Sequence, residues 1–312
     1  MISVVIPLYN KVSTIERAIL SVLTQTVQDF ELIVVNNGST DGSEKVVENI
    51  NDARIKLLHQ NNQGVSMARN RGIEEASSEW VAFLDADDEW RPTFLETVVQ
   101  LREKYPDCDV YATAYQRCDN SGNFKNIKLQ GLSAEAQETG QKKDSFLLEN
   151  YFEVAAQSDP PFCSISVMVR KEALMAIGGF PKGIHQGEDL LTWARLAANG
   201  KIAYSLKPQS IFHTGETSSM GIPKRIPAAD DPVGKGLEEI YNQHPETRGL
   251  KQYIAHWHKM RASIYLRLPD CSRQCREEIR AARHWHRNKR LVYYQILSYI
   301  PYRFRMNIIN HI

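Results

Sequence analysis

Several features that mark other protein classes are missing from this sequence. No stretch approaches the ~20 apolar residues that a membrane-spanning helix needs. No expected strand is followed by Gly-x-Gly-x-x-Gly, which argues against a dinucleotide-dependent oxidoreductase. The 5 cysteines are odd in number and scattered, a pattern that fits a reducing compartment better than a disulfide framework. Residues 1–7 are too short and lack the basic start of a signal peptide, so the sequence predicts a cytoplasmic protein.

The composition is that of an ordinary globular protein, with charge divided unevenly along the chain. Of the 312 residues, 42% are hydrophobic and 24% are charged, which excludes global disorder. Residues 1–250 hold 25 Lys and Arg against 34 Asp and Glu, a net charge of −9. Residues 251–312 hold 13 against 3, a net of +10. This division predicts an acidic body with a basic C-terminal region that meets an anionic surface.

Apolar runs alternate with amphipathic segments over the first third of the chain. The expected strands are Ser3–Pro7, Glu31–Val35, Ile55–His59 and Trp80–Leu84, and the expected helices are Thr14–Leu23, Ser43–Asn51, Gly64–Ala76 and Pro92–Lys104. Strands separated by helices predict an α/β fold, with a mostly parallel twisted sheet flanked by helices.

The rest of the chain is less regular. Strands are expected at 109–116 and Ser164–Val169, helices at Lys171–Ile177 and Leu190–Asn199, and a polar surface excursion over 118–145. Residues 215–234 have the composition of a linker, and from about 235 the pattern is helical, with breaks at Pro245, Pro269 and Pro301. We therefore expect a catalytic domain over 1–220 and a linker with a basic helical region over 221–312.

The most informative segment is an expected buried strand that ends in acids. Trp80–Leu84 leads directly into Asp85, Asp87 and Asp88. Clustered carboxylates need a compensating cation, and hard oxygen ligands suit Mg²⁺ or Mn²⁺. The carboxyl ends of strands are also where open α/β sheets bind ligands, and phosphate is the common partner of such a metal. Capping of the helix near Pro92 is the alternative, and it explains Asp88 better than Asp85.

Six motifs, in order and spacing, resemble the family 2 glycosyltransferases of the nucleotide-sugar-binding GT-A fold. They are Pro7-Leu-Tyr-Asn10, Asn36-Asn-Gly-Ser-Thr-Asp41, Gly64-Val-Ser-Met-Ala-Arg-Asn-Arg-Gly72, Phe83-Leu-Asp-Ala-Asp-Asp88, Gly178-Gly-Phe180, and Gly187-Glu-Asp-Leu190 with Trp193-Ala-Arg-Leu196. Each motif is weak alone, but their shared order is specific. The resemblance covers roughly residues 1–220.

The resemblance implies roles for five acidic or histidine residues. Asp85 would lie near the ribose, and Asp87 would be the principal ligand of Mn²⁺ or Mg²⁺ on the donor diphosphate. Glu188 and Asp189 would supply the general base that deprotonates the acceptor hydroxyl, with direct displacement and inversion. Asp189 as an N-terminal helix cap is the alternative. His213 would complete the cation site or contact the diphosphate, although a lone histidine is more often structural.

The resemblance also implies a nucleobase site, where this chain departs from the family pattern. Asn36 and Asn37 replace two aspartates, but the Asn37 amide can still accept a hydrogen bond from the ring N–H of uracil. Pro7 and Tyr9 would pack on the base, and Arg69 would lie near base and phosphates. The alternatives are a plain Asn-Asn-Gly turn, Tyr9 as core filling, and Arg69 on a solvated helix face.

Basic and aromatic residues alternate in the C-terminal region. Seven cations between Arg273 and Arg290 precede a stretch that contains Tyr293, Tyr294, Tyr299 and Tyr302. This pattern favours peripheral contact with an anionic membrane, on the inner face of the cytoplasmic membrane and beside a lipid-linked acceptor. Packing of these helices on the acidic body is the alternative. No recognised module supports nucleic-acid binding.

These observations favour a metal-assisted inverting glycosyltransferase that moves a hexosyl or N-acetylhexosaminyl group from a nucleotide sugar to a glycan or lipid-linked hydroxyl. A metal-dependent nucleotidyltransferase also needs paired carboxylates, but Pro7-Leu-Tyr-Asn-Lys11 lacks the glycines of its phosphate loop. A non-catalytic nucleotide-sugar-binding protein is the third hypothesis, and the intact Asp85, Asp87 and Asp189 argue against it.

Overall fold

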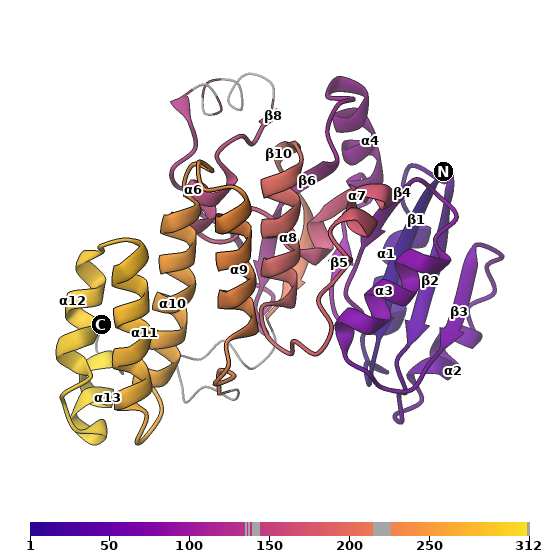
Figure 1. Cartoon of the computed structure of the whole chain (residues 1–312). Helices are drawn as coiled ribbons and strands as arrows, with labels where there is room; N and C mark the ends of the chain where they lie inside the picture. The colour runs from indigo at the N-terminus through magenta and orange to yellow at the C-terminus, as the bar shows by residue number, and fades with distance from the viewer. Residues whose placement is uncertain (135, 137, 139–143, 215–225, 311–312) are drawn as a thin grey trace. The chain divides into compact units, whose positions relative to one another are not determined.

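The chain folds into two compact units. The computed structural model describes residues 1–134, 136, 138, 144–214 and 226–310 (Figure 1). One unit comprises Met1–Glu149 and Ser158–Gly215, and the other comprises Asn150–Gln157 and Glu216–Ile312. The predicted domain boundary at residues 220 and 221 lies outside the described residues.

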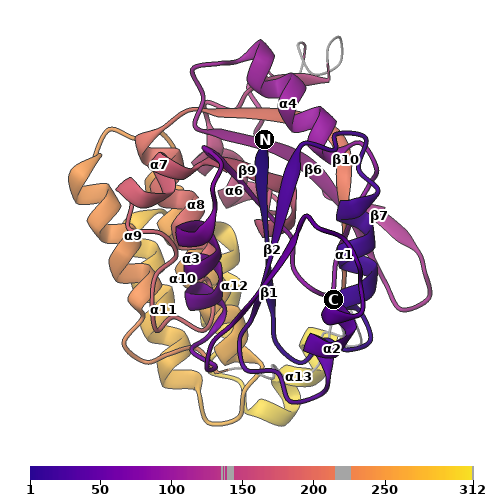
Figure 2. The same ribbon diagram turned by 90° about the vertical axis from the view of Figure 1, so that its right-hand side faces the viewer.

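The first unit begins with four parallel strands in the order β3-β2-β1-β4. These strands and the helices between them are β1 (Ile2–Leu8), α1 (Ile15–Leu23), β2 (Phe30–Asn36), α2 (Ser43–Glu48), β3 (Ile55–His59), α3 (Val65–Glu75) and β4 (Trp80–Phe83). Figure 2 shows α1 and α3 on opposite sides of β1 and β2. The predicted α/β architecture is confirmed. Because the strands run parallel, the segments that follow β1, β2 and β4 meet at one edge of the sheet.

Beyond β4 the same sheet becomes mixed. The order continues β4-β9-β6-β10-β5, with β7 beside β6 and β8 beside β10. These strands and the helices of this part are β5 (Glu89–Trp90), α4 (Phe94–Lys104), β6 (Val110–Cys118), β7 (Phe124–Asn126), β8 (Ser145–Leu147), β9 (Val167–Arg170), α7 (Lys171–Ala176), α8 (Glu188–Asn199) and β10 (Ile202–His213). β9 is antiparallel to both β4 and β6, whereas β10 is parallel to β6.

One predicted strand starts later than expected. Ser164–Ser166 is a 3₁₀ turn, and only β9 from Val167 onward is extended. The Cys163 amide donates to the Ser166 hydroxyl at 3.1 Å, and the Ser166 amide donates to the Cys163 carbonyl at 3.0 Å. A serine side chain that bonds nearby backbone competes with strand pairing, which explains the difference.

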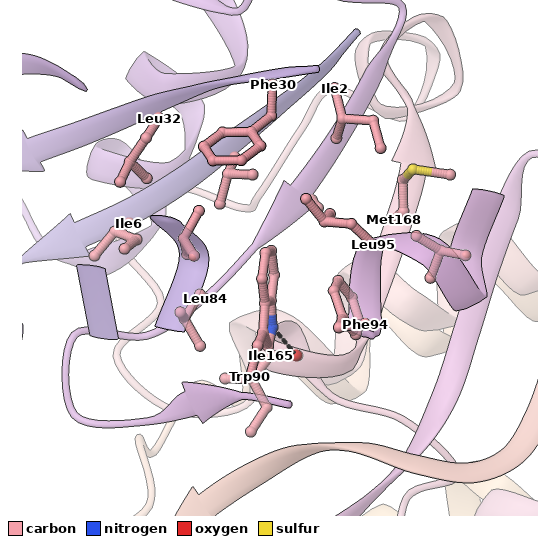
Figure 3. Close-up of a cluster of buried hydrophobic side chains, with 14 of the residues drawn as sticks. Ile2, Ile6, Phe30, Leu32, Leu84, Trp90, Phe94, Leu95, Ile165 and Met168 are labelled. Carbon is pink, nitrogen blue, oxygen red and sulfur yellow. Dashed lines mark hydrogen bonds between the residues drawn. The ribbon is translucent and has the colours of Figure 1, made fainter. Parts of the chain in front are cut away.

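The core of the first unit anchors the segment after β4 that carries Asp85, Asp87 and Asp88, called the acidic run below. Figure 3 shows apolar side chains of β1 and β2 gathered around Leu84, Trp90 and Phe94. The Trp90 ring stacks on Phe94 with centroids 4.1 Å apart, and its Nε1–H donates to the Ile165 carbonyl at 2.7 Å. Burial of such a side chain stabilises the fold by roughly 1.5–3 kcal/mol. Leu84 and Trp90 thus hold both ends of the segment that carries Asp85, Asp87 and Asp88.

The second unit is helical in its described residues. Its helices are α6 (Tyr151–Gln157), α9 (Pro232–Gln243), α10 (Leu250–Leu266), α11 (Ser272–Trp285), α12 (Lys289–Leu297) and α13 (Tyr302–Asn310). Pro245, Pro269 and Pro301 lie between helices, as predicted, whereas the break between α11 and α12 contains no proline. None of the helices that the structure describes is both long and apolar enough to cross a bilayer.

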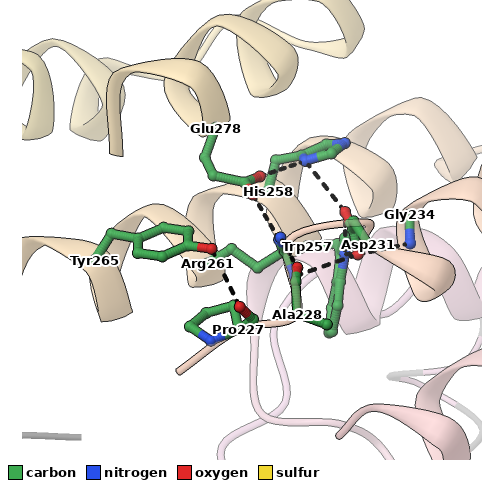
Figure 4. A network of polar contacts seen from close by, with 9 residues as sticks. All are labelled: Pro227, Ala228, Asp231, Gly234, Trp257, His258, Arg261, Tyr265 and Glu278. Atoms are coloured by element: carbon green, nitrogen blue, oxygen red, sulfur yellow. Dashed lines mark hydrogen bonds and ion pairs between the residues drawn. The ribbon is translucent and has the colours of Figure 1, made fainter. Parts of the chain in front are cut away.

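A buried polar network joins three helices of the second unit (Figure 4). Asp231 caps α9 by accepting from the Gly234 amide at 3.1 Å, and it also accepts from Trp257 Nε1 of α10 at 3.0 Å. Glu278 of α11 accepts from Arg261 Nε at 2.6 Å and lies 2.7 Å from His258 Nδ1. Arg261 also lies 3.4 Å from an Asp231 oxygen. Because paired charges avoid the cost of isolated burial, this network fixes the positions of α9, α10 and α11.

The contact of α3 with β1 leads to a test of the fold. A Cβ added at Gly72 would lie 2.3 Å from Val5 Cγ1, and Val5 is fully buried. We expect Gly72→Ala to lower the free energy of unfolding by about 1–3 kcal/mol, despite the better helix propensity of alanine. Val5→Ala should cost less in that background than in the wild type, and the exposed Glu74→Ala should change stability by less than about 0.5 kcal/mol. Urea unfolding measures all three, and additive effects of the pair would contradict the contact.

Candidate active site

Hydrogen bonds join the segments that follow β1, β2 and β4 at the edge of the sheet. The Asn10 amide donates to Ser39 Oγ at 3.1 Å, and the Thr40 amide donates to Asn10 Oδ1 at 2.8 Å. Asn10 adopts a left-handed conformation, with φ of 51°, which asparagine tolerates better than most residues. Thr14 Oγ1 donates to the Ala86 carbonyl at 2.8 Å. These bonds bring the first, second and fourth motifs into one place.

Asn37 has partners at both ends of its amide. Its Oδ1 accepts from Gln60 Nε2 at 2.8 Å and from the Gln63 amide at 3.1 Å, and its Nδ2 donates to Asn62 Oδ1 at 3.1 Å. Asn36 Oδ1 accepts from the Ser39 amide at 2.9 Å, so the turn-forming interpretation of Asn-Asn-Gly holds. A role of Asn37 in base recognition stays a prediction.

The two other residues predicted at the nucleobase differ in exposure. Pro7 lies within β1, in register with Val35 of β2. Tyr9 follows the strand and is 45% exposed, so the alternative that it fills the core is wrong. Its ring is open to solvent directly after the strand. The position therefore leaves an aromatic face for a planar ligand to stack on.

Arg69 is the central cation of the site. It projects from α3 and is only 4% exposed, so the alternative of a solvated helix face is wrong. Its Nη2 lies 2.7 Å from Asp85 Oδ1, and its Nη1 lies 3.4 Å from Glu188 Oε1. Burial alone would lower the pKa of Arg69, but Asp85 and Glu188 outweigh it and raise the pKa. One guanidinium therefore joins the acidic run after β4 to the start of α8.

The neighbouring Asn70 explains the Gly178-Gly-Phe180 motif. Its Nδ2 donates to the Phe180 carbonyl and its Oδ1 accepts from the Phe180 amide, both at 2.8 Å. Gly179 has φ of 68°, and a Cβ there would lie 2.5 Å from Asn70 Oδ1. Only glycine fits this conformation and this approach. The clamp holds the Phe180 ring 5.0 Å from the Arg69 guanidinium, at cation–π distance.

The acidic run has unequal partners. Asp87 Oδ2 lies 2.5 Å from Lys11 Nζ, and Arg17 donates to the Asp87 carbonyl. Lys11 directly follows the Pro7–Asn10 motif, yet no sequence pattern predicted this contact. His213 Nε2 lies 3.0 Å from Glu89 Oε1. Each of Asp85, Asp87 and His213 therefore has its own protein partner in this structure.

Asp88 is the acid of the run with the least compensation. It is 1% exposed and accepts from the His213 amide at 2.7 Å, not from α4, so the capping alternative is wrong for it. Its Oδ2 has no hydrogen-bond partner among the described residues. Burial, followed by the charges of Asp85 and Asp87, raises the pKa of Asp88 well above its ordinary value. An unsatisfied carboxylate beside two others fits a divalent cation.

Asp189, one of the two acids predicted to supply the base, has a raised pKa. It lies in the first turn of α8, after Gly187. Burial raises the pKa of Asp189 to about 6, helped by the charge of Glu188 and opposed by that of Arg69. A carboxylate with this pKa is ionised at pH 7.5 and is a better proton acceptor than an ordinary aspartate. Asp85 also raises the pKa of Asp189, so the predicted base and the acidic run share one electrostatic site.

A second cluster has metal-ligating residue types. Within the described parts of the chain, only Asp231, His258 and Glu278 bring three such ligand atoms within 4.8 Å of one another. Arg261 already supplies the positive charge there, through its contacts with Glu278 and Asp231. The predicted ligands Asp85, Asp87 and His213 do not form such a group in this conformation, so their joint coordination of a metal stays a prediction.

Substitution of Arg69 tests whether its buried ion pairs hold this site together. Arg69→Ala leaves two partly buried carboxylates without their cation, so we expect a loss of about 3–5 kcal/mol in the free energy of unfolding. Arg71 lies on the same helix, is 51% exposed and pairs with Glu75 at 2.7 Å. Arg71→Ala should cost about 0.5 kcal/mol, as for an exposed helix pair. Equal losses for the two variants in urea unfolding would show that Arg69 is not a buried bridge.

Comparison with known proteins agrees with this geometry. The family model described as Glycosyl transferase family 2 matches residues 3–176. A relative named as an uncharacterized glycosyltransferase, from Rickettsia bellii (strain RML369-C), is 31% identical over 202 residues, 63% of this chain and 26% of that protein. YibD of Escherichia coli (strain K12), also named as a glycosyltransferase, is 46% identical over 102 residues, 32% of this chain and 30% of that protein. The matched segments thus span less than a third of the length of these two relatives.

The fold also matches a solved structure. The crystal structure of S. aureus TarS 1-349 in complex with UDP-GlcNAc has a TM-score of 0.64 and 17% sequence identity, covering 99% of this chain and 91% of that chain. At this identity the likeness concerns the fold, and it confirms the predicted GT-A type. The family model covers more than half of the 312 residues. With six motifs meeting in one site, the chain belongs to glycosyl transferase family 2.

Proposed function

We propose that the chain is an inverting glycosyltransferase that moves a sugar from a nucleotide diphosphate, preferably a UDP-sugar, to a hydroxyl of a glycan or lipid-linked acceptor. The observation that carries the proposal is the bridge of Arg69 between Asp85 and Glu188, at 2.7 and 3.4 Å. This bridge supports the proposal because it joins the acidic run to Glu188, the chain neighbour of Asp189. The residues proposed to assist departure of the diphosphate and those proposed to deprotonate the acceptor are therefore parts of one site.

Asp87 and Asp85 are the proposed ligands of Mn²⁺ or Mg²⁺, with His213 as a third. Such a cation would stabilise the negative charge that develops on the departing diphosphate. The Oδ2 atom of Asp88, which has no hydrogen-bond partner among the described residues, is a further oxygen close to these acids. Lys11 neutralises Asp87 in this structure, and its ammonium would contact the diphosphate once Asp87 takes another partner.

Asp189 is the proposed base. It takes the proton of the acceptor hydroxyl while the hydroxyl oxygen bonds to the anomeric carbon and the bond electrons leave with the diphosphate. Glu188 is held by Arg69, whereas Asp189 receives a hydrogen bond from its neighbouring Leu190 amide at 2.8 Å. Of the two acids, Asp189 is therefore the one whose carboxylate forms no ion pair with Arg69. A single displacement from the opposite face inverts the anomeric configuration.

The donor would be recognised at Pro7, Tyr9, Asn37 and Arg69. Asn37 Oδ1 can accept from a ring N–H in place of Gln60, because a half-buried glutamine side chain at the surface can move away at low cost. The TarS structure of similar fold is a complex with UDP-GlcNAc, which supports a UDP-sugar as the donor. Tyr9 is exposed and available to stack on the base.

A place in the cytoplasm and peripheral contact with an anionic membrane belong to the same proposal. The exposed large side chains of the second unit include Tyr299 of the α12–α13 connection, at 69%, and Phe304 of α13, at 66%. Arg303 is exposed beside Phe304. Aromatic and basic side chains together suit the headgroup region of a membrane, where a lipid-linked acceptor for polysaccharide or lipopolysaccharide synthesis would lie.

Calorimetric titration with a panel of nucleotide sugars, with and without Mn²⁺, tests the class and the donor. We expect binding of a UDP-sugar that depends on Mn²⁺. Asp87→Asn should weaken this binding by about 100-fold or more, because it removes the principal metal ligand. Asp107→Asn, at an exposed aspartate of the same unit, is the control. Metal-independent binding that Asp87→Asn leaves intact would contradict the metal assignment.

The raised pKa of Asp189 gives a test with a defined sign. Below pH 6 the carboxyl is protonated, so kcat should fall about tenfold per pH unit there. Asp189→Asn should keep donor binding and lose about 10²–10⁴-fold in kcat. Because folding raises this pKa, ionised Asp189 opposes folding above pH 6, and the variant should be more stable at pH 7.5, by at most about 3 kcal/mol. A variant with full turnover would remove Asp189 as the base.

A further inference from the structure

The second unit contains a cavity, and none of the residues that line it is a predicted active-site residue. It has a volume of about 360 Å³ and is lined by residues of α6, α10, the α11–α12 connection and the start of α12. Its polar lining residues are Gln157, Gln252, His256, Lys259, His286 and Asn288. This volume falls within the range of small-molecule sites. None of the lining residues is a carboxylate, so no lining group balances the positive charge of Lys259.

The hydrogen bonds around His256 leave Lys259 without a hydrogen-bond acceptor among the described residues. His256 Nδ1 lies 2.7 Å from the Ala156 carbonyl, and because a carbonyl only accepts, Nδ1 must carry the proton. Lys259 Nζ lies 3.2 Å from the same Nδ1 and so cannot donate to it. No ion pair of Lys259 or of the nearby Arg290 occurs among the residues that the structure describes. An ammonium in this setting is short of an anionic partner.

The electrostatics of these groups agree with the geometry. Burial lowers the pKa of Lys259, and the charge of Arg290 lowers it further. Burial, together with Lys259 and Arg290, lowers the pKa of His256 to about 4, so this ring is neutral at physiological pH. Asn288 caps α12 by accepting from the Arg290 amide at 2.8 Å, so the partly positive start of that helix also lies at the cavity.

The approach to the cavity is basic as well. A wider, more open depression of about 600 Å³ shares Asn288 with it, and Arg283, Arg287 and Lys289 contribute to its lining. Uncompensated cations of one sign attract and concentrate anions. The three amides Gln157, Gln252 and Asn288 are suited to hydroxyl groups, since each can donate and accept hydrogen bonds.

We propose that this cavity binds a phosphate monoester on a hydroxyl-rich body, of the size of a sugar phosphate, with Lys259 as the main contact to phosphate. Two kinds of molecule carry such a phosphate group: a soluble sugar phosphate and the phosphate headgroup of a lipid. Every lining residue belongs to the second unit, and none has a role in the proposed transfer reaction.

Calorimetry on the full chain with glucose 6-phosphate, inorganic phosphate and glucose as probes tests the proposal. We expect glucose 6-phosphate to bind and glucose not to bind. Lys259→Gln should weaken binding about tenfold or more, as for loss of a charge-assisted contact. Asn288→Asp keeps a good helix cap and adds a repelling carboxylate, so it should abolish binding without unfolding the protein. Lys251→Gln, at an exposed lysine of the same helix, should bind as the wild type does.

Two further measurements distinguish a lipid headgroup from a soluble ester, and this cavity from the donor site. Vesicles containing phosphatidic acid should compete with glucose 6-phosphate if the lipid headgroup reaches the cavity, and should leave its binding unchanged if only soluble esters enter; either result supports a phosphate site. Asp87→Asn should leave glucose 6-phosphate binding unchanged, which separates this site from the donor site. No heat from glucose 6-phosphate at about 10 mM, a concentration beyond the weakest specific affinities, or binding that neither Lys259→Gln nor Asn288→Asp weakens, would overturn the proposal.

Discussion

The arrangement of the active site depends on one buried guanidinium. Arg69 can stay ionised at 4% exposure only because Asp85 and Glu188 supply opposite charge on two sides. Those acids come from the end of β4 and the start of α8, which are far apart in sequence. The ion pairs therefore fix the relative position of two segments that each carry part of the proposed chemistry. Without the cation, the acids after β4 and those at the start of α8 would repel each other.

The sequence around Arg69 serves this bridge. Gly72, one turn further along α3, lets the helix lie against Val5 of β1, because a Cβ there would lie 2.3 Å from Val5 Cγ1. Asn70 clamps the segment before α8 through both its amide groups. Gly179 then adopts a conformation that leaves room for the clamp. The third, fourth, fifth and sixth motifs of the sequence are thus parts of a single mechanical unit.

Much of this could be predicted from the sequence, because it depends on local patterns. The alternation of strands and helices, the acids after β4 and the place of Asp189 at a helix start follow from periodicity, turn residues and motif order. The pairings could not be predicted, since they depend on distances between remote segments. Lys11 with Asp87, Asp88 with the His213 amide, and the network of Asp231, Arg261 and Glu278 are of this kind. The 3₁₀ turn at Ser164–Ser166 was missed because a side-chain hydroxyl, not the apolar pattern, decides its conformation.

The two units handle charge in different ways. In the second unit Arg261 pairs with both Asp231 and Glu278, so one buried cation offsets part of the charge of two acids. Arg248 and Arg273 of this unit pair with Glu153 and Glu277, whereas Lys259 and Arg290 have no carboxylate partner among the described residues. In the first unit the excess is negative and gathers at the end of β4. This contrast agrees with the proposed binding of a divalent cation by the first unit and of a phosphate monoester by the second.

The most direct test of the account asks whether Arg69 is required because of the acids it joins. Free energies of unfolding at pH 7.5 should be compared for Arg69→Met alone and for Arg69→Met combined with Asp85→Asn and Glu188→Gln. If the bridge neutralises buried charge, the triple variant should be more stable than the single variant, by about 1–4 kcal/mol. A triple variant as unstable as the single one, or less stable, would contradict the account.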